Sequence, residues 1–242
     1  IVIPQSNCEE FFKIVGYLVS EGSKELNRGK LIGINFTNKD PVLLQDFDSS
    51  MKTLFGLEPY KQARIDDHDT RWMLRYISRE LASFFERVCP TLLQNANRKE
   101  LPQVVMKAEK INIAKMLKCM FEGDGHVSKK LRTIRVGYAT NSKRLAEQVQ
   151  DLLLRFSIRS NLTEHKESYK VSITGYGNIL NYRRYIGFVS KGKNGIIEDY
   201  LREKTPIRTV KDIIPNVSEK VIYLLEKYGV KNIENYKFYD IK

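Results

Sequence analysis

Two apolar stretches of similar pattern begin the two halves of the chain. The first covers residues 11–22 and reads FFKIVGYLVSEG, and the second covers residues 114–125 and reads AKMLKCMFEGDG. Both are apolar almost throughout, and both end in an acidic residue followed by glycine. A helix that is apolar all round is buried in the protein interior. We therefore predict that each half begins with a buried helix.

The same offset relates further residues of the two halves. Glu21-Gly22 recurs as Asp124-Gly125 after 103 positions, and Thr37-Asn38 recurs as Thr140-Asn141 after the same 103 positions. Similarity at one fixed offset is the sequence mark of a repeated structural unit. The chain is therefore predicted to contain two copies of one unit.

Patterns typical of strands and helices follow each apolar stretch in the same order. Alternation of apolar and polar residues predicts strands, and apolar residues spaced by three and four predict helices. In the first copy we expect strands over 30–37, 57–65 and 70–78, and helices over 43–54 and 79–88. In the second copy we expect strands over 131–139, 158–164 and 168–174, and helices over 145–156 and 177–186. We interpret each copy as α-β-β-α-β-β-α, with one further strand beside the first that these ranges do not delimit. This order, found twice, predicts an α+β fold of two pseudo-symmetric repeats, with helices on one face of each antiparallel sheet.

The repeats divide the chain into four segments. In order, we expect the first repeat over 1–94, a linker over 95–110, the second repeat over 111–190 and a C-terminal extension over 191–242. Pro102 should break any helix in the linker. The role of the extension is not indicated by its sequence. It is expected to begin with a loop over residues 191–195 (KGKNG) and to contain a short amphipathic helix over residues 218–228.

Small residues lie on one face of each apolar helix. Gly16 and Ser20 are four positions apart, and Cys119 and Gly123 take the equivalent positions in the second copy. Small side chains at this spacing let two helix backbones approach closely. We therefore expect the two helices to pack against each other about a pseudo-twofold axis, with these four residues at the helix interface.

Glu21 and Asp124 would then converge at the C-terminal ends of the paired helices. The helix dipole is negative at this end and carbonyl groups are unpaired there, so two acids are destabilising unless a cation joins them. Mg²⁺ prefers such oxygen ligands. The alternative is that both are unrelated surface acids before a turn glycine. Their matching positions in the repeat favour a metal site.

Composition adds a class of partner to this picture. The chain has 41 Lys and Arg against 29 Asp and Glu, a net charge of +12, and its pI is about 9.5. An excess of this size indicates a polyanionic partner such as nucleic acid, although a solvated basic surface is the alternative. Three scattered cysteines and the lack of an apolar run of ~20 residues favour an intracellular protein without a disulfide framework, a zinc site or a membrane span.

The residues that carry this chemistry resemble a known family. IVGYLVSEG (14–22) and LKCMFEGDG (117–125) are similar to the two signature helices of LAGLIDADG homing endonucleases, and the resemblance extends over residues 9–190. SYKVSITGYGNILNYRRYIGF (168–188) is similar to a segment of endonuclease domains embedded in archaeal inteins. The resemblance implies a monomer of two αββαββα units whose saddle-shaped sheets face the DNA major groove. It also implies double-strand cleavage of a long asymmetric site, with 3′ overhangs.

The resemblance further implies roles for individual residues. Divalent ions, Mg²⁺ or else Mn²⁺, would be held by Glu21 and Asp124 together with backbone carbonyl groups of Ser20 and Gly123. The side chains expected to position water and the phosphate in catalysis are Asn38, Lys39, Arg75, Asn141 and Lys170. The basic side chains expected to contact DNA are Lys30, Arg71, Lys129, Lys130, Arg132, Arg135 and Lys170.

The function predicted from the sequence is therefore a magnesium-dependent DNA endonuclease, placed in the cytoplasm with the chromosome. The alternative on the same fold is a protein that binds nucleic acid without cutting it, either a transcription regulator or an RNA maturase. The presence of both acids favours the nuclease. Whether such a domain stands alone, is encoded in an intron or is part of an intein is left open.

Overall fold

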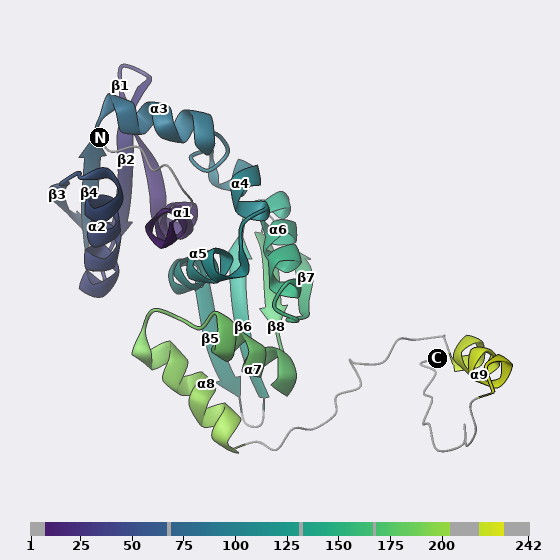
Figure 1. The fold of residues 1–242 in the computed structure, drawn as a ribbon. Coiled ribbons are helices and arrows are strands. Elements are labelled where there is room, and N and C mark those ends of the chain that lie inside the picture. Colours follow the sequence, from purple (N-terminus) through teal and green to yellow (C-terminus); the bar gives the residue numbers. More distant parts are fainter. Residues whose placement is uncertain (1–7, 67–68, 131–132, 167, 204–217, 230–242) are drawn as a thin grey trace. The chain divides into compact units, whose positions relative to one another are not determined.

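The chain forms two compact units, Ile1–Thr205 and Pro206–Lys242. In a computed structural model, the described residues are 8–66, 69–130, 133–166, 168–203 and 218–229 (Figure 1). The second unit contributes one described helix, α9 (Ser218–Lys227), where the sequence predicts a short helix. All other elements belong to the first unit.

The first unit contains two copies of one order of elements (Figure 1). The first copy comprises α1 (Glu9–Glu21), β1 (Gly22–Asn27), β2 (Lys30–Asn38), α2 (Pro41–Phe55), β3 (Tyr60–Asp66), β4 (Asp69–Ile77) and α3 (Arg79–Val88). The second comprises α5 (Lys110–Gly123), β5 (Gly125–Lys130), β6 (Thr133–Thr140), α6 (Lys143–Leu154), β7 (Ser160–His165), β8 (Ser168–Ile173) and α7 (Tyr176–Tyr185). The predicted α+β class and its repeated αββαββα order are confirmed.

Each repeat builds one four-stranded antiparallel sheet. The strand orders are β1-β2-β4-β3 and β5-β6-β8-β7, so the two sheets have the same topology. The helices cover one face of each sheet. In the first repeat, rings of Tyr17 and Phe47 from the helices pack on Phe36 and Tyr76 from the strands. We call the other face of each sheet, which the strand alternation turns away from these helices, the open face.

Local sequence signals determine where the helix after the second strand of each repeat begins. Asp40 precedes α2, and its carboxylate accepts a hydrogen bond from the Val42 N–H at 2.8 Å. Ser142 precedes α6, and its hydroxyl oxygen accepts from the Leu145 N–H at 3.2 Å. Both are N-caps, which satisfy N–H groups that have no partner within the helix. The two helices therefore begin at equivalent points, just beyond the ends of β2 and β6.

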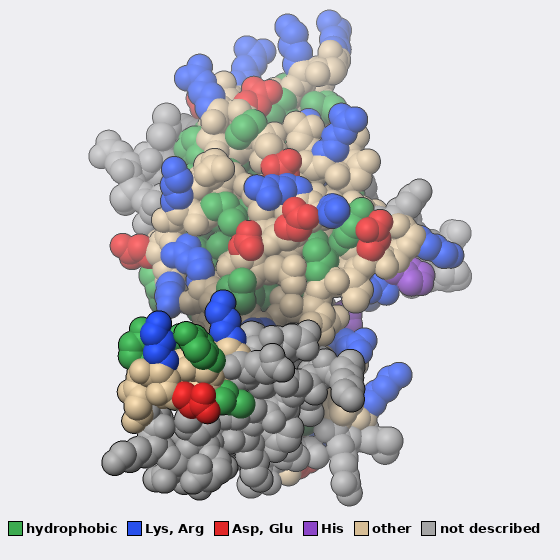
Figure 2. All heavy atoms as spheres, turned by 90° about the vertical axis from the view of Figure 1, so that its right-hand side faces the viewer, with side chains coloured by type: hydrophobic (Ala, Val, Ile, Leu, Met, Phe, Trp, Pro, Cys, Tyr) green, Lys and Arg blue, Asp and Glu red, His purple; other side chains and the backbone are tan. Residues whose placement is uncertain are grey.

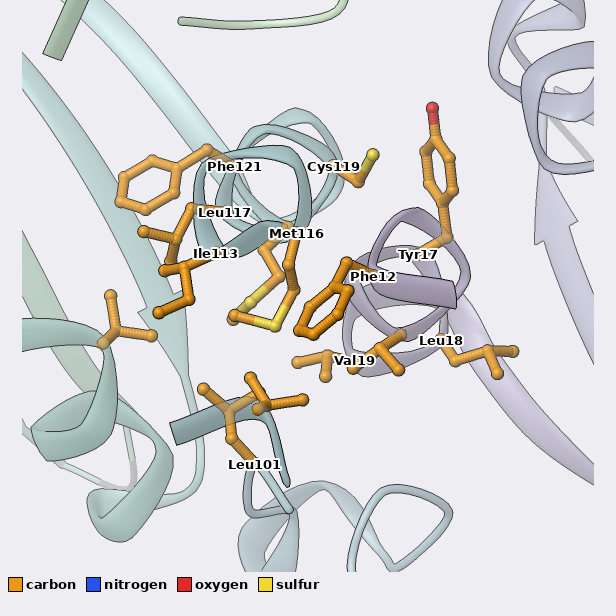
Figure 3. Packing of buried hydrophobic residues seen from close by; sticks show 14 of the residues in the cluster. Phe12, Tyr17, Leu18, Val19, Leu101, Ile113, Met116, Leu117, Cys119 and Phe121 are labelled. Atoms are coloured by element: carbon orange, nitrogen blue, oxygen red, sulfur yellow. The ribbon is translucent and has the colours of Figure 1, made fainter. Parts of the chain in front are cut away.

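The two repeats meet through α1 and α5, which form the most extensive contact between any two described elements. Figure 3 shows Phe12 of α1 and Met116 of α5 pointing toward one another, with Leu101 of the linker beside them. A Cβ atom added at Gly16 would lie 2.4 Å from the Met116 carbonyl oxygen. This close backbone approach requires a residue without a side chain, and it aligns the C-terminal ends of the two helices.

The segment between the repeats is ordered by contacts with the second repeat. It contains a 3₁₀ turn, Ala96–Arg98, and a short helix, α4 (Gln103–Met106), which starts directly after Pro102. The Leu101 N–H donates to Gln148 Oε1 at 2.8 Å, and Gln148 Nε2 donates to the Leu101 carbonyl at 3.0 Å. Both hydrogen bonds are buried, so they hold the linker on α6.

The start of the C-terminal extension differs from the sequence prediction. The loop expected over residues 191–195 is wrong, because α8 (Lys191–Glu203) begins there. The Asn194 side chain donates to the carbonyl groups of Phe188 and Ser190 and accepts from the Phe188 N–H. Ile197 and Tyr200 are buried. These contacts outweigh the weak helix propensity of the two glycines in the first turns.

The described surface carries charges of both signs. Figure 2 shows one face, on which Lys and Arg side chains are spread with Asp and Glu side chains among them, so the basic residues form no single patch in the coloured part of this view. Among the described residues, no helix is long and apolar enough to cross a membrane.

Candidate nuclease site at the paired helix ends

Two acids meet where α1 and α5 end. Glu21 is the last residue of α1, and Asp124 follows the last residue of α5. Gly123 lets them approach, because a Cβ added there would lie 2.5 Å from Ser20 Oγ and 3.5 Å from Glu21 Cγ. The four small residues expected at the helix interface are brought together in this contact, since Gly16 lies against Cys119 in the same way.

Burial disfavours the charge on both acids. It raises the pKa of Glu21, and the nearby charges of Arg71 and Lys99 lower that pKa. The pKa of Asp124 is raised to about 6, by burial first and by the negative charge of Glu21 second, while the positive charge of Lys99 lowers it. Two carboxylates that share a partly buried site repel each other unless a cation is added. The pair therefore forms a place where positive charge is stabilised.

Two lysines lie at equivalent places beside these acids. Lys99 Nζ donates to the carbonyl oxygens of Val19 at 2.7 Å and Gly22 at 3.4 Å. Lys193 Nζ donates to the carbonyl oxygens of Glu122 at 2.7 Å and Gly125 at 3.1 Å. The acceptors correspond at the 103-residue offset of the repeat. Each signature helix therefore has an ammonium group at its C-terminal carbonyls, as the helix dipole favours.

These two lysines were not among the predicted site residues. Lys99 belongs to the linker and Lys193 to α8, so the spacing between them is 94 residues and not 103. The repeat offset therefore does not connect them in the sequence. Burial lowers the pKa of Lys99, while Asp124 and Glu21 raise it. Lys99 is thus the cation that is coupled to both acids.

The two lysines have different surroundings. Glu122 is buried, lies 3.2 Å from Lys193 Nζ and accepts a hydrogen bond from the Ser190 N–H at 2.9 Å. The equivalent position in the first repeat is the apolar Val19. The Lys193 ammonium also lies 5.1 Å from the centre of the Phe188 ring. The two halves of the site are therefore pseudo-symmetric and chemically distinct.

A cavity of about 250 Å³ opens beside Glu21. It is lined by Glu21, Thr37, Asn38, Lys39, Asp40, Leu43, Arg71, Glu122 and Gly123. Asn38, Lys39 and Arg71 thus lie around the same cavity as Glu21. The catalytic role predicted for Asn38 and Lys39 requires such a position. Asn38 Oδ1 accepts from the Asp40 N–H at 2.9 Å, which orients its side chain. Polar and cationic groups beside an acid are suited to hold a phosphate.

Basic groups of the second repeat and of α8 lie near His126 on the open face of the second sheet. Lys170, Arg135 and Lys193 all lower the pKa of His126, after burial as the largest cause. The His126 ring lies on Gly137, because a Cβ added there would come 2.4 Å from Cε1. Lys170 and Arg135 therefore lie near His126, which follows the second acid by two residues. Asn141 is exposed directly after β6.

Other predicted residues lie elsewhere. Arg75 is bound by Glu25 in a two-point ion pair on the open face of the first sheet. Lys129 Nζ lies 2.7 Å from Glu203 of α8, and its strand partner Ile134 is buried. This placement differs from the DNA-facing position expected for Lys129. Lys30 and Lys130 are exposed at strand ends, and Arg132 lies outside the described residues.

The donor set suits a hard divalent cation. Glu21 and Asp124 supply carboxylate oxygens, and the helix ends supply carbonyl groups. Within the described part of the chain, no three His, Cys, Asp or Glu side chains are grouped as a metal cage. Mg²⁺ is commonly bound by one or two carboxylates together with substrate phosphates, and does not require such a cage. The residues present therefore fit a metal that is completed by a phosphate ligand.

Comparison with known proteins identifies the family. A family model described as "LAGLIDADG-like domain" matches residues 10–89 and 112–187. The chain belongs to this LAGLIDADG family. The two matched segments contain the two repeats, so the LAGLIDADG resemblance of the two apolar helices is confirmed.

Curated relatives of this LAGLIDADG chain carry names of different kinds. Glutamine–fructose-6-phosphate aminotransferase of Methanocaldococcus jannaschii is 24% identical over 211 residues, which are 84% of this chain and 18% of that protein. The probable translation initiation factor IF-2 of the same organism is 37% identical over 121 residues, 45% of this chain and 10% of that protein. A DNA gyrase subunit of Mycolicibacterium flavescens is 28% identical over 176 residues, 72% of this chain and 31% of that protein. The LAGLIDADG chain thus spans less than a third of each relative.

Solved structures share the fold of the LAGLIDADG chain at low identity. I-DmoI in complex with DNA and Mn is 17% identical with a TM-score of 0.54, over 74% of this chain and 96% of that one. The homing endonuclease I-WcaI bound to its DNA recognition sequence is 13% identical with a TM-score of 0.57, over 80% of this chain and 88% of that one. Full-length DUF199/WhiA from Thermatoga maritima is 15% identical with a TM-score of 0.58, over 96% of this chain and 70% of that one. These likenesses establish the fold.

Proposed function

We propose that the chain is a site-specific endonuclease that hydrolyses both strands of DNA with divalent metal ions held by Glu21 and Asp124. The observation that carries the proposal is the meeting of these two acids at the ends of α1 and α5, each end bearing a lysine ammonium on its carbonyl groups. Mg²⁺ is the ion we propose, with Mn²⁺ as a substitute. Both acids come from one chain, which supports action as a monomer.

The residues around the acids have separate tasks in this proposal. When bound, the metal supplies Lewis-acid stabilisation of the scissile phosphate and a water of lowered pKa. Lys99 and Lys193 place a positive charge beside each acid and stabilise the negative charge that develops on the phosphate oxygens. Asn38, Lys39 and Arg71 orient the phosphate at the Glu21 side. Lys170 and His126 orient the phosphate at the Asp124 side.

The open faces of the two sheets are the proposed DNA-binding surface. Both faces begin beside the acids, since β1 and β5 directly follow α1 and α5. Their side chains differ at equivalent positions, with Ser23 on β1 matched by His126 on β5. A surface with two unlike halves favours an asymmetric target. The net charge of +12 supports binding to a polyanion.

The names of the relatives support an embedded domain. An aminotransferase, an initiation factor and a gyrase subunit have no activity in common by name, and each matches this chain over 31% of its length or less. A segment that occurs within such different proteins is expected to be an inserted element. We therefore propose that the chain is the endonuclease domain of an intein. Mass spectrometry of the longer gene product should find the flanking segments joined without it, and a product that always keeps it would contradict the proposal.

Selection for cleaved sites tests the nuclease. A randomised duplex library incubated with Mg²⁺ should yield one cleaved sequence, and a plasmid that carries it should be linearised. Glu21→Gln and Asp124→Asn should abolish cutting and keep DNA binding, because each substitution removes a metal ligand and retains side-chain shape. Glu109→Gln is the matched control, since Glu109 is an exposed acid at the other end of α5. Unchanged cutting by both site variants would refute the assignment.

A DNA-binding protein that does not cut is the second candidate. It is favoured by the likeness to WhiA, which extends over 96% of this chain and whose description names no nuclease. Sequence-selective binding without cleavage in Mg²⁺ or Mn²⁺ would support this function. Binding to structured RNA in place of DNA would support an RNA maturase.

A further inference from the structure

An arginine on the open face of the first sheet is held by a carboxylate. Arg75 Nε donates to Glu25 Oε2 at 3.1 Å, and Arg75 Nη2 donates to Glu25 Oε1 at 2.7 Å. The Glu25 side chain is 12% exposed and the Arg75 side chain is 32% exposed. The guanidinium group is thus fixed along one edge by a largely buried acid and still reaches the surface.

The strand register explains how the two side chains meet. Arg75 on β4 pairs with Asn35 on β2, and Glu25 on β1 pairs with Gly33 on β2. Glu25 and Arg75 are therefore separated by the central strand and displaced by two residues along it. Gly33 has no side chain, so the carboxylate can pass over β2 to the guanidinium group. A β-bulge in β1 directly after Glu25 supports this placement at the edge of the sheet.

The geometry leaves one edge of the guanidinium group for another acceptor. Arginine has five N–H donors in a rigid plane. Glu25 uses the side edge, formed by Nε and Nη2, so the end edge keeps one N–H from each Nη. Two parallel donors of this spacing match O6 and N7 of guanine in the major groove. Gln62 Oε1 accepts a hydrogen bond from Nη1 at 3.5 Å, which uses one N–H of this nitrogen, leaves its other N–H and limits rotation of that end.

We propose that Arg75 reads one guanine in the DNA target and that Glu25 is the positioning residue that presents the guanidinium group. The inference rests on the proposed DNA-binding function. A phosphate clamp fits less well, because Glu25 neutralises the charge of Arg75 and its own charge would be repelled by phosphates. A neutral, oriented pair contributes little to overall affinity and much to the choice of base.

The second sheet has a different pair of residues at these positions. By strand register, Ser172 on β8 takes the place of Arg75, and Ser128 on β5 takes the place of Glu25. Arg135 on β6 takes the place of Gly33. The guanine requirement is therefore expected in only one half of the target, the half that the first repeat contacts.

Selection by binding, without cutting, tests the inference. The full chain is incubated with randomised duplexes in Ca²⁺, and bound sequences are compared for the wild type, Arg75→Lys and Glu25→Gln. The wild type should prefer guanine at one position by about 10- to 100-fold. Arg75→Lys keeps the charge but lacks the flat pair of donors, so this preference should fall to within about threefold. Glu25→Gln should weaken the same preference, because the guanidinium group is less firmly oriented.

Controls separate this inference from the proposed function. Arg135→Lys should leave the guanine preference at the Arg75 position intact, and circular dichroism should show that every variant is folded. If Arg75→Lys changes the base preference at no position, or lowers affinity for all sequences alike, Arg75 does not read a base. The proposed DNA-binding function would be unaffected by that result. A wild type that binds no duplex would overturn both the inference and the proposed function.

Discussion

Gly123 of α5 lies against Ser20 of α1 so closely that a Cβ atom at Gly123 would come 2.5 Å from Ser20 Oγ. The same Cβ atom would lie 2.6 Å from Ser20 Cβ, which cannot rotate away as the hydroxyl can, so a side chain here requires movement of one helix. The contact is one residue before Asp124 and one residue before Glu21, so the separation of the two acids depends on it. Packing of small residues and placement of the two acids are therefore one structural feature.

Gly16→Ala should destabilise the fold. The added methyl group would lie 2.4 Å from the backbone oxygen of Met116, which cannot turn aside as a side chain can. We expect overpacking to lower the free energy of unfolding by about 1–3 kcal/mol, although alanine favours a helix by about 1 kcal/mol. Urea unfolding measures the change. Gly192→Ala is the control, since no atom lies within 4 Å of its added Cβ and stability should rise or hold. A Gly16→Ala variant as stable as the wild type would contradict the packing.

Lys99→Met and Lys193→Met should each slow cutting of one strand more than the other. Each ammonium group lies on the C-terminal carbonyl groups of one signature helix, and loss of such a group is expected to reduce the rate by about 10²- to 10³-fold. Supercoiled plasmid with the target site should therefore accumulate as a nicked circle. Lys143→Met, at an exposed position of α6, should cut both strands normally. Full-rate linearisation by either site variant would exclude that lysine from catalysis.

The metal-free protein should gain stability from Asp124 as the pH falls. The folded pKa of Asp124 is about 6, above its ordinary value of about 3.9, so the folded state binds a proton that the unfolded state lacks between these values. The contribution is present below the folded pKa and is lost as the pH rises through 6. We expect the free energy of unfolding, relative to Asp124→Asn, to rise by about 1 kcal/mol from pH 7 to pH 5. Urea unfolding in EDTA measures it, and a difference independent of pH would refute the shift.

Metal binding should show the opposite dependence on pH. A divalent ion requires ionised carboxylates, so protons compete with it at Asp124 and Glu21. Cutting at low Mg²⁺ concentration should therefore decline as the pH falls below about 6, where Asp124 takes up its proton. Saturating Mg²⁺ should move this decline to lower pH. A pH profile that is the same at low and at saturating Mg²⁺ would show that another group controls the rate.

Glu122→Ala should loosen α8 while the rest of the fold persists. The Glu122 carboxylate accepts from the Ser190 N–H at 2.9 Å and lies 3.2 Å from Lys193 Nζ, so it ties the start of α8 to α5. Hydrogen exchange of the α8 amides should be faster in the variant, and exchange in α3 should be unchanged. Glu203→Ala removes an exposed ion pair with Lys129 and should have a smaller effect. Equal exchange of α8 in both variants would contradict this anchoring role.

The elements that could be predicted are those in which a local pattern and the fold agree. Alternation places β2 at residues 30–37, and the structure has Lys30–Asn38. The helix expected over 79–88 is α3, Arg79–Val88. Alternation did not delimit β1 and β5, because their mainly polar and partly exposed residues give no apolar face to detect. Helix α8 was missed because its glycines favour a loop, and it is stabilised by burial and by side-chain hydrogen bonds such as those of Asn194.

The sequence by itself determined the repeat, the two signature helices and the two acids, because each depends on residue type at a fixed offset along one chain. Only the tertiary structure decided which basic residues stand beside those acids. Lys99 and Lys193 lie in segments outside the repeat pattern, and Arg75 forms an ion pair with Glu25 across the central strand of the sheet. Ion pairing and burial depend on distances through space, and these arise only when separate segments have packed together.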